Sequence, residues 1–248
     1  MATNKLWDAA YRLHERELRW LDRLPELLAA RSDWPVDRTV AFDVGASVGV
    51  YSRSLARWCT RVHAIAPNAT LVPGLQDMPD HVLVHNAAAG SAAGHGHLTD
   101  TSADGLRRPL ARLGDPSQAA WSQACDIIRL DTLEPNAPAA WIAKIDTEGT
   151  EADVIEGLGA RLDDPFAMVL VEIEALHNPD FREVFNRMEQ NGFVPCRVAF
   201  GRLRPAQADD VLRHARGPGG RLSALWPWSN NYIFLRSNVA THLGAARR

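Results

Sequence analysis

The amino-acid sequence predicts an α/β fold, in which a mostly parallel sheet carries helices on both faces. Three observations favour this fold. From residue 38 onward, short apolar runs alternate with helix-length segments, which is typical of parallel strands joined by crossover helices. The stretch 41–52 reads as a strand that turns through small residues into a helix, and 248 residues suffice to bury a full core.

The first element is a predicted amphipathic helix over residues 5–28, which is interrupted at Pro25. Its inward-facing stripe consists of Trp7, Tyr11, His14, Leu18 and Leu21. We expect residues 1–35 to form a helical extension that acts as a lid or as a homodimer surface. Residues 36–248 are then the main domain.

Seven segments carry the apolar pattern of buried strands: 39–45, 61–67, 81–90, 141–149, 166–174, 193–200 and 230–236. An eighth segment, 127–135, matches the pattern less well. Helices are predicted after the first strand, from Thr150 to Leu158 and from Asp180 to Gly192, with capping boxes at Thr150 and Asp180. No crossover helix of normal length separates the last two strands, so we expect an antiparallel pair. Residues 201–229 form the one long irregular region.

The composition excludes several classes of protein. A formal net charge of −3 at pH 7 gives no electrostatic reason to bind a polyanion, so nucleic acid is not an expected partner. Cys59, Cys125 and Cys196 are odd in number and far apart, which predicts neither a disulfide framework nor a metal-ligand pair. The sequence shows no signal-peptide core and no run of about 20 apolar residues, so we expect a cytoplasmic protein without a membrane span.

The segment DVGASVG, from Asp43 to Gly49, ends the first predicted strand, where open parallel sheets bind their ligands. Gly45 allows a tight turn, and Gly49 allows the close approach of a helix or a ligand. The spacing is G-x-x-x-G rather than the G-x-G-x-x-G of a pyrophosphate-binding loop, which favours S-adenosylmethionine over a dinucleotide. The alternative is that the glycines only form a turn.

Four segments together resemble the FkbM-type methyltransferases, a family of S-adenosylmethionine-dependent O-methyltransferases with a Rossmann-like fold. They are FDVGASVGVYS (42–52), HNAAAG (85–90), RLDTLEP (129–135) and KIDTEGTEADVIEGL (144–158). The resemblance implies a class I methyltransferase fold with a mostly parallel seven-stranded sheet. It also implies S-adenosylmethionine as the cofactor.

The same resemblance implies a cofactor site at the strand ends. Its residues, carried over one by one, are Asp43, Gly45, Ser47 and Gly49 around the methionine end, Asn86 near the adenine, and Asp146 facing the methyl-transfer site. In this family the second strand ends with a carboxylate that grips the ribose hydroxyls, whereas Ala66 stands in that place here. The loss of two charge-assisted hydrogen bonds costs about 2–4 kcal/mol. We expect the amide of Asn68 to substitute.

Acidic residues follow two neighbouring predicted strands, and two readings stay open for them. Asp146 and Glu172 can take part in general-base catalysis, or they can bind Mg²⁺ together with Glu174, because hard oxygen ligands suit this ion. The structural alternatives are that Glu151 stabilises a helix N-terminus and that Glu172 pairs with Lys144.

His177 follows the strand that ends at this acidic rim and is the preferred base, ahead of His95 and His97. The alternative for each is a solvated loop histidine. Trp226 and Trp228 suit stacking on a sugar ring or a planar small molecule, or else they plug the edge of the sheet.

The sequence therefore predicts an S-adenosylmethionine-dependent O-methyltransferase that acts on a hydroxyl of a sugar, a glycan or a natural product. Two alternatives stay open. One is a catalytically degenerate binding or scaffold protein, indicated by Ala66, and the other is a Rossmann oxidoreductase that uses NAD(P). Nucleic-acid methylation is disfavoured by the net charge and by the absence of an Asn-Pro-Pro-aromatic run after the fourth strand.

Overall fold

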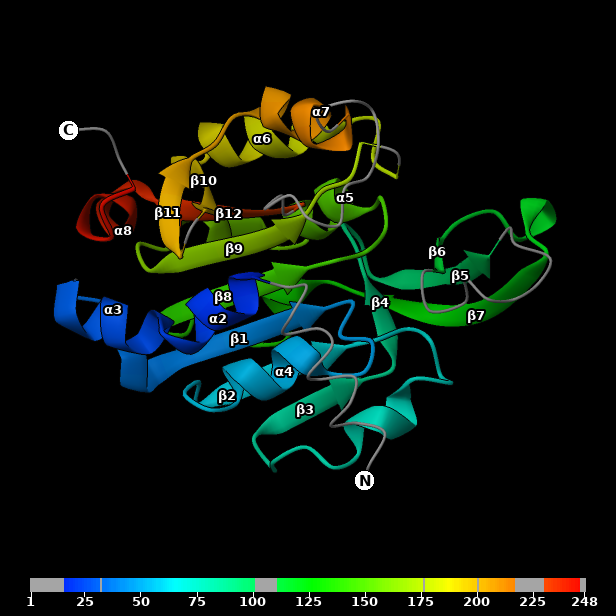
Figure 1. The fold of residues 1–248 in the computed structure, drawn as a ribbon. Coiled ribbons are helices and arrows are strands. Elements are labelled where there is room, and N and C mark those ends of the chain that lie inside the picture. The colour runs from blue at the N-terminus through cyan, green and yellow to red at the C-terminus, as the bar shows by residue number, and fades with distance from the viewer. Residues whose placement is uncertain are drawn as a thin grey trace.

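A computed structural model describes residues 16–31, 33–100, 111–175, 177–199, 201–216 and 230–245. These residues form an eight-stranded main sheet with helices packed on it, and a separate four-stranded sheet (Figure 1). The small sheet stands beyond the carboxyl ends of the main parallel strands, so it faces the edge where ligands of such sheets bind.

The main sheet is mostly parallel. Its strands, in spatial order, are β11 (Arg202–Pro205), β10 (Phe193–Ala199), β12 (Asn231–Arg236), β9 (Ala167–Glu172), β8 (Ala140–Ile145), β1 (Thr39–Val44), β2 (Arg61–Ile65) and β3 (Val82–His85). The strands from β9 to β3 run parallel, while β12 is antiparallel to both β9 and β10. The mostly parallel sheet and the antiparallel last pair are therefore confirmed.

The predicted count of seven strands is wrong by one. The extra strand is β11, which pairs with β10 in a hairpin that turns at Gly201. This glycine has a φ of +71°, a left-handed conformation that favours glycine. Helix α7 (Ala208–Arg216) follows β11. The prediction that residues 201–229 are irregular is therefore wrong for the part that forms β11 and α7. An Arg182–Asp209 ion pair of 2.6 Å links α7 to α6.

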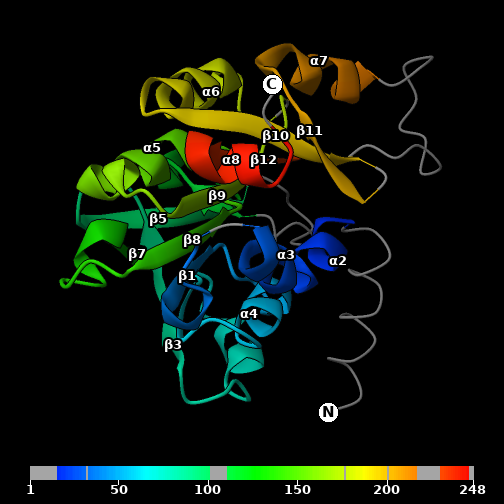
Figure 2. The same cartoon turned by 90° about the vertical axis from the view of Figure 1, so that its left-hand side faces the viewer.

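The central strands β1, β8 and β9 are buried along almost their whole length, as expected for parallel strands covered on both faces. One face is covered by α2 (Arg16–Asp22), α3 (Leu24–Arg31), α4 (Val50–Leu55) and α8 (Ser237–His242), and the other by α5 (Glu151–Glu156), α6 (Phe181–Gln190) and α7. Figure 2 shows α5 and α6 on one side of the strands and α2, α3 and α4 on the other.

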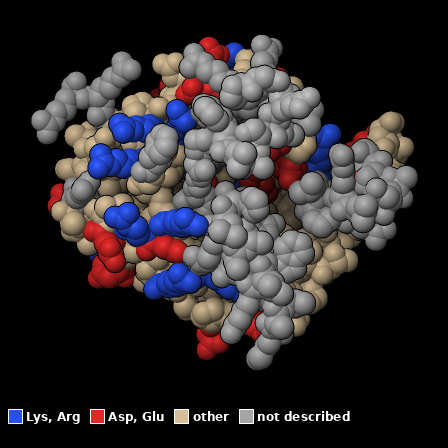
Figure 3. All heavy atoms as spheres, in the orientation of Figure 1, with Lys and Arg blue, Asp and Glu red and all other residues tan. Residues whose placement is uncertain are grey.

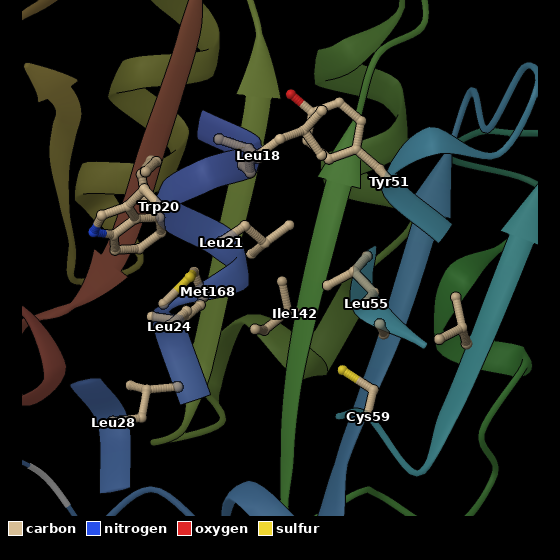
Figure 4. Close-up of a cluster of buried hydrophobic side chains, with 14 of the residues drawn as sticks. Leu18, Trp20, Leu21, Leu24, Leu28, Tyr51, Leu55, Cys59, Ile142 and Met168 are labelled. Carbon is tan, nitrogen blue, oxygen red and sulfur yellow. The ribbon is translucent and has the colours of Figure 1, made fainter. Parts of the chain in front are cut away.

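The N-terminal helices are part of one hydrophobic cluster. Leu18, Leu21 and Leu24 are buried with Ile142 of β8 and Met168 of β9, and Figure 4 shows these side chains gathered over the strands. Pro25 lies in the first turn of α3, where its missing N–H is tolerated. Trp7, Tyr11 and His14 lie outside the described residues. The division at residue 35 stays a prediction.

The small sheet was not expected from the sequence. It consists of β4 (Ala87–Ala89), β7 (Trp121–Ile128), β5 (Gly94–Asp100) and β6 (Arg112–Leu113). The predicted single strand at 81–90 is divided between the two sheets, as β3 and β4. Strands β5 and β7 are half exposed and rich in polar residues and glycine, so they lack the apolar pattern by which the main strands were found.

Short 3₁₀ turns connect several of these elements: η1 (Val36–Arg38), η2 (Val72–Leu75), η4 (Pro116–Gln118), η5 (Leu130–Thr132) and η6 (Gly159–Asp163). Helices α5 and α6 begin where the sequence predicts. The predicted capping boxes are wrong, because neither Thr150 nor Asp180 makes a side-chain capping hydrogen bond. Within the described ranges, no helix has the length and apolar character that crossing a bilayer requires.

We expect Leu24→Ala to lower the free energy of unfolding by about 2–5 kcal/mol, because it leaves a cavity between α3 and the sheet. Urea denaturation of the full chain measures this. Arg19→Ala on exposed surface is the control and should change stability by less than about 0.5 kcal/mol. Equal stability of the Leu24→Ala variant and the wild type would show that the N-terminal helices do not contribute to the core.

Candidate cofactor and methyl-transfer site

The turn between β1 and α4 brings the ends of two central strands into contact. Gly45 has a φ of +80°, and a Cβ atom there would lie 1.8 Å from the carbonyl oxygen of Asp146. Gly49 also has a φ of +80°, but a Cβ atom there would meet the side chains of Leu75 and Met78. Both glycines are therefore required, Gly45 for the meeting of strands β1 and β8 and Gly49 for the packing of η2 on α4.

The large pocket opens at this turn and contains about 850 Å³ of empty space, counting its open mouth. Its walls come from the turn after β1, the loop after β2, the small sheet and the loop after β8. Of the predicted cofactor residues, Gly45, Ser47, Asn68 and Asp146 line it. A pocket of this size accommodates a nucleoside-sized ligand.

The loop after β2 holds the residues expected around the ribose and the adenine. Ala66 lines the large pocket and is almost fully buried. The side-chain oxygen of Asn68 accepts hydrogen bonds from the backbone N–H and the hydroxyl of Thr70. Asn86 does not line the large pocket, because its amide donates to the carbonyl oxygens of Ala66 and Pro67. Asn86 thus holds the loop that forms the pocket wall.

A second cavity, which we call the Lys144 pocket, adjoins the large one. It contains about 380 Å³ of empty space, and it shares Gly45, Ser47 and Asp146 with the large pocket. Asp43 also lines this smaller cavity. Of the residues predicted around the methionine end, Gly45 and Ser47 line both pockets and Asp43 lines the Lys144 pocket alone. Gly49 lines neither pocket.

Asp43 and Lys144 are two buried charged residues on adjacent strands, where they face each other in the β1–β8 register. The carboxylate of Asp43 accepts a hydrogen bond from the hydroxyl of Ser52. Burial nevertheless raises the pKa of Asp43 to about 6, although Ser52 and Lys144 both act to lower it.

Lys144 occupies the place where a metal ion was predicted. Its Nζ lies 3.5 Å from a carboxylate oxygen of Asp146 and 3.7 Å from one of Glu172, and 5.0 Å from the ring centroid of Tyr51. The expected pairing of Glu172 with Lys144 is thus confirmed. Among the described residues, no group of three or more acidic, histidine or cysteine side chains is arranged to hold a metal. The Mg²⁺ prediction for Asp146, Glu172 and Glu174 is not supported, because an ammonium group already lies between the first two carboxylates.

A third, smaller hollow, the acidic pocket, lies beside the loop after β8 and is lined by carboxylates and one histidine: Asp146, Glu148, Glu151, Glu172, Glu174 and His177, together with Gly149 and Asn178. Figure 3 shows acidic side chains near the middle of the face viewed there. Nδ1 of His177 lies 2.6 Å from Glu148 and 3.6 Å from Glu174. The structure thus places His177 next to the carboxylates with which the sequence grouped it.

Glu148 connects the large pocket to the acidic pocket, because it lines both. Its φ of +58° is uncommon for a residue other than glycine. Burial, with help from neighbouring Asp146, raises the pKa of its carboxyl group. A Cβ atom on Gly149 would come within 2.4 Å of the carbonyl oxygen of His177, so the loop after β8 and the histidine segment meet closely.

Glu151 has the structural role that the sequence favoured. One of its oxygens accepts hydrogen bonds from the backbone N–H groups of Thr147 and Gly149, and the other accepts one from the amide of Asn178. These bonds fix the loop after β8 at the start of α5. A carboxylate near a helix N-terminus is also favoured electrostatically.

The segment 129–135 is structural as well. Arg129 donates two hydrogen bonds to the carboxylate of Asp131 and one to the carbonyl of Ser91. Glu134 accepts one hydrogen bond from Arg61 and pairs with the buried ring of His63 at 2.9 Å. This motif therefore ties the small sheet to the main sheet and contributes no residue to the three pockets.

Several wall residues could not be found from the sequence. Leu98, Arg112 and Leu113 of the small sheet line the large pocket, and no local motif marks them. Of the other base candidates, His95 is exposed and pairs with Asp126 at 2.8 Å, and His97 is also exposed. Trp226 and Trp228 lie outside the described residues.

The raised pKa of Asp43 predicts a specific pH dependence of stability. The pKa of the Asp43 carboxyl is 3.8 in the unfolded chain and about 6 in the folded protein. The contribution of this group to the free energy of unfolding therefore falls as the pH rises between these values. Asp43→Asn removes this titration, and its stability relative to the wild type should rise by about 2 kcal/mol from pH 4 to pH 7. Urea denaturation at each pH measures the difference, and parallel profiles for the two proteins would contradict the assignment.

The solved structures to which this chain is similar include two methyltransferases and a decarboxylase. Methyltransferase FkbM from Methylobacillus flagellatus KT is 15% identical, with a TM-score of 0.49, over 80% of this chain and 44% of that one. Precorrin-6y C5,15-methyltransferase from Geobacter metallireducens GS-15 is 12% identical, with a TM-score of 0.37, over 85% of this chain and 87% of that one. Precorrin 8w decarboxylase from Methanobacterium thermoautotrophicum is 14% identical, with a TM-score of 0.38, over 86% of this chain and 88% of that one.

The chain thus covers less than half of the FkbM structure that it matches. No curated protein matches the sequence. The family model described as the methyltransferase FkbM domain matches residues 43–195, from the carboxylate of β1 to β10. Because this match spans more than half of the chain, the protein belongs to the FkbM methyltransferase family.

Proposed function

We propose that this protein is an S-adenosylmethionine-dependent O-methyltransferase whose acceptor is a hydroxyl group of a sugar, a glycan or a natural product. The observation that carries the proposal is the open pocket at the Gly45 turn, which adjoins a hollow lined by carboxylates and His177. A cofactor pocket and a proton-accepting group at one sheet edge are what methyl transfer to a hydroxyl requires. With the family shown, the NAD(P) alternative is not retained.

The adenosyl part of the cofactor fits the large pocket, and its amino-acid end fits the Lys144 pocket. Gly45, Ser47 and Asp146 stand where the two hollows join, which is where the sulfonium would lie. Bound S-adenosylmethionine supplies an electrophilic methyl group. Asn68 lies beside Ala66 in the wall expected at the ribose, and Asn86 acts indirectly by holding that wall.

The acceptor hydroxyl is proposed to enter from the acidic pocket. There His177 accepts its proton, and Glu148, 2.6 Å away, stabilises the resulting imidazolium. Asp146 orients the hydroxyl, and Glu172 supports Asp146 through Lys144, which lies between them. The sugar or glycan class, the cytoplasmic location and dimerisation through the N-terminal helix remain predictions.

A second candidate is a methyltransferase-fold protein that has lost catalysis, and Ala66 favours it. A carboxylate at this position would add two charge-assisted hydrogen bonds to the ribose, together contributing about 2–4 kcal/mol.

Calorimetric titration with S-adenosylhomocysteine tests the cofactor. We expect the wild type to bind and Ala66→Glu to bind at least about tenfold more tightly, because the added carboxylate reaches the ribose. Ala66→Gln is the matched control, since it fills similar space without charge. No heat of binding by the wild type at millimolar ligand would remove the enzymatic proposal, and binding gained only by Ala66→Glu would favour the degenerate protein.

Replacing the proposed base should affect the chemical step alone. His177→Gln is expected to lower kcat by about 10²- to 10⁴-fold, while the affinity for S-adenosylhomocysteine stays within about twofold. Mass spectrometry of methyl transfer to a panel of monosaccharides, oligosaccharides and glycosylated natural products supplies the activity. The control is His95→Gln, an exposed histidine outside the acidic pocket. An unchanged kcat for His177→Gln would rule out this histidine as the base.

A further inference from the structure

The Lys144 pocket carries charges of both signs. Asp43 and Asp146 supply two carboxylates, and Lys144 is the one cationic side chain among the described residues that line it. Its remaining walls are small or apolar residues, apart from Ser47 and the ring of Tyr51. A site with this distribution suits a ligand group that itself carries an ammonium and a carboxylate, which is the chemistry of a free amino-acid end.

Three backbone donors of the turn are already engaged inside the protein. The N–H groups of Gly45 and Ala46 both donate to the carbonyl of Ile65, and the N–H of Gly49 donates to the carbonyl of Ala46. In many anion sites such N–H groups point at the ligand, but these three are committed inside the protein. A side-chain donor would therefore add to the binding of a carboxylate in this pocket.

Lys144 is placed to be that donor. Its Nζ lies 3.5 Å from Asp146, 3.7 Å from Glu172 and 3.5 Å from the carbonyl oxygen of Ile145. The two carboxylate distances are longer than the 2.7–2.9 Å that is typical of charge-assisted hydrogen bonds. The side chain is 1% exposed, so a ligand carboxylate beside it would be attracted with little screening by water.

We infer that Lys144 binds the carboxylate of the amino-acid end of S-adenosylmethionine, while Asp43 and Asp146 face the ammonium of the same ligand. The inference rests on the proposed function and assigns to Lys144 a role in cofactor selectivity. Adenosine derivatives without the amino-acid carboxylate are then discriminated at this lysine. The competing role is purely internal, in which Lys144 only neutralises Asp146 and Glu172.

The test compares three probes by calorimetry on the full-length protein: S-adenosylhomocysteine, its analogue that lacks only the carboxylate, and 5′-methylthioadenosine. We expect the wild type to bind S-adenosylhomocysteine roughly 10- to 100-fold more tightly than the decarboxylated analogue, because one charge-assisted contact is lost. Lys144→Met should abolish this preference while leaving the affinity for 5′-methylthioadenosine within about twofold. Arg57→Met, which removes an exposed cation paired with Asp22, is the matched control and should keep the preference.

Each outcome decides between the two roles. Equal affinity of the wild type for S-adenosylhomocysteine and the decarboxylated analogue overturns the inference, and so does an unchanged preference in Lys144→Met. If that variant loses its circular dichroism spectrum, Lys144→Met combined with Glu172→Gln removes the orphaned carboxylate as well. Should both variants fail to fold, equal affinity of the wild type for S-adenosylhomocysteine and the decarboxylated analogue would still overturn the inference. A wild type that binds none of the three probes contradicts the proposed function instead.

Discussion

The contact between Gly45 and the carbonyl of Asp146 is the constraint on which the site depends. Any side chain at residue 45 would overlap that oxygen, so β1 and β8 can end side by side only with glycine there. The meeting point separates three hollows: the large pocket toward β2, the Lys144 pocket toward α4, and the acidic pocket toward β9. Asp146 lines all three because it stands at this junction.

Buried charge is the second organising feature. Asp43 and Lys144 lie side by side on two strands that are otherwise apolar, and Asp146 and Glu172 extend the group to the rim. Buried charges are costly unless they are paired, and a group with more carboxylates than ammonium groups is incompletely balanced. Burial raises the pKa of Asp43, and the neighbouring carboxylate of Asp146 adds to this rise. A ligand that carries positive charge would reduce it.

Much of the scaffold follows from local patterns in the sequence. Buried parallel strands are continuous apolar runs, so β1, β2, β8 and β9 could be recognised, and the glycine spacing located the turn between β1 and α4. The sequence also offered the pairing of Glu172 with Lys144 as one of its open readings, and it favoured a supporting role for Glu151 because this residue stands at the start of a helix. Strands β5 and β7, with their mixed polar sequences, and the short hairpin strand β11 gave no such signal.

By itself, the sequence determined the fold class, the family and the edge of the sheet where the site lies, because these depend on periodicity and on glycine-rich or acidic motifs close together in the chain. Only the tertiary structure decided that Asn86 supports the pocket wall, that an ammonium group stands between Asp146 and Glu172, and that the small sheet closes the large pocket. The reason is physical: each of these depends on contacts between segments distant in sequence, and the direction in which a side chain points is set by packing that no local pattern encodes.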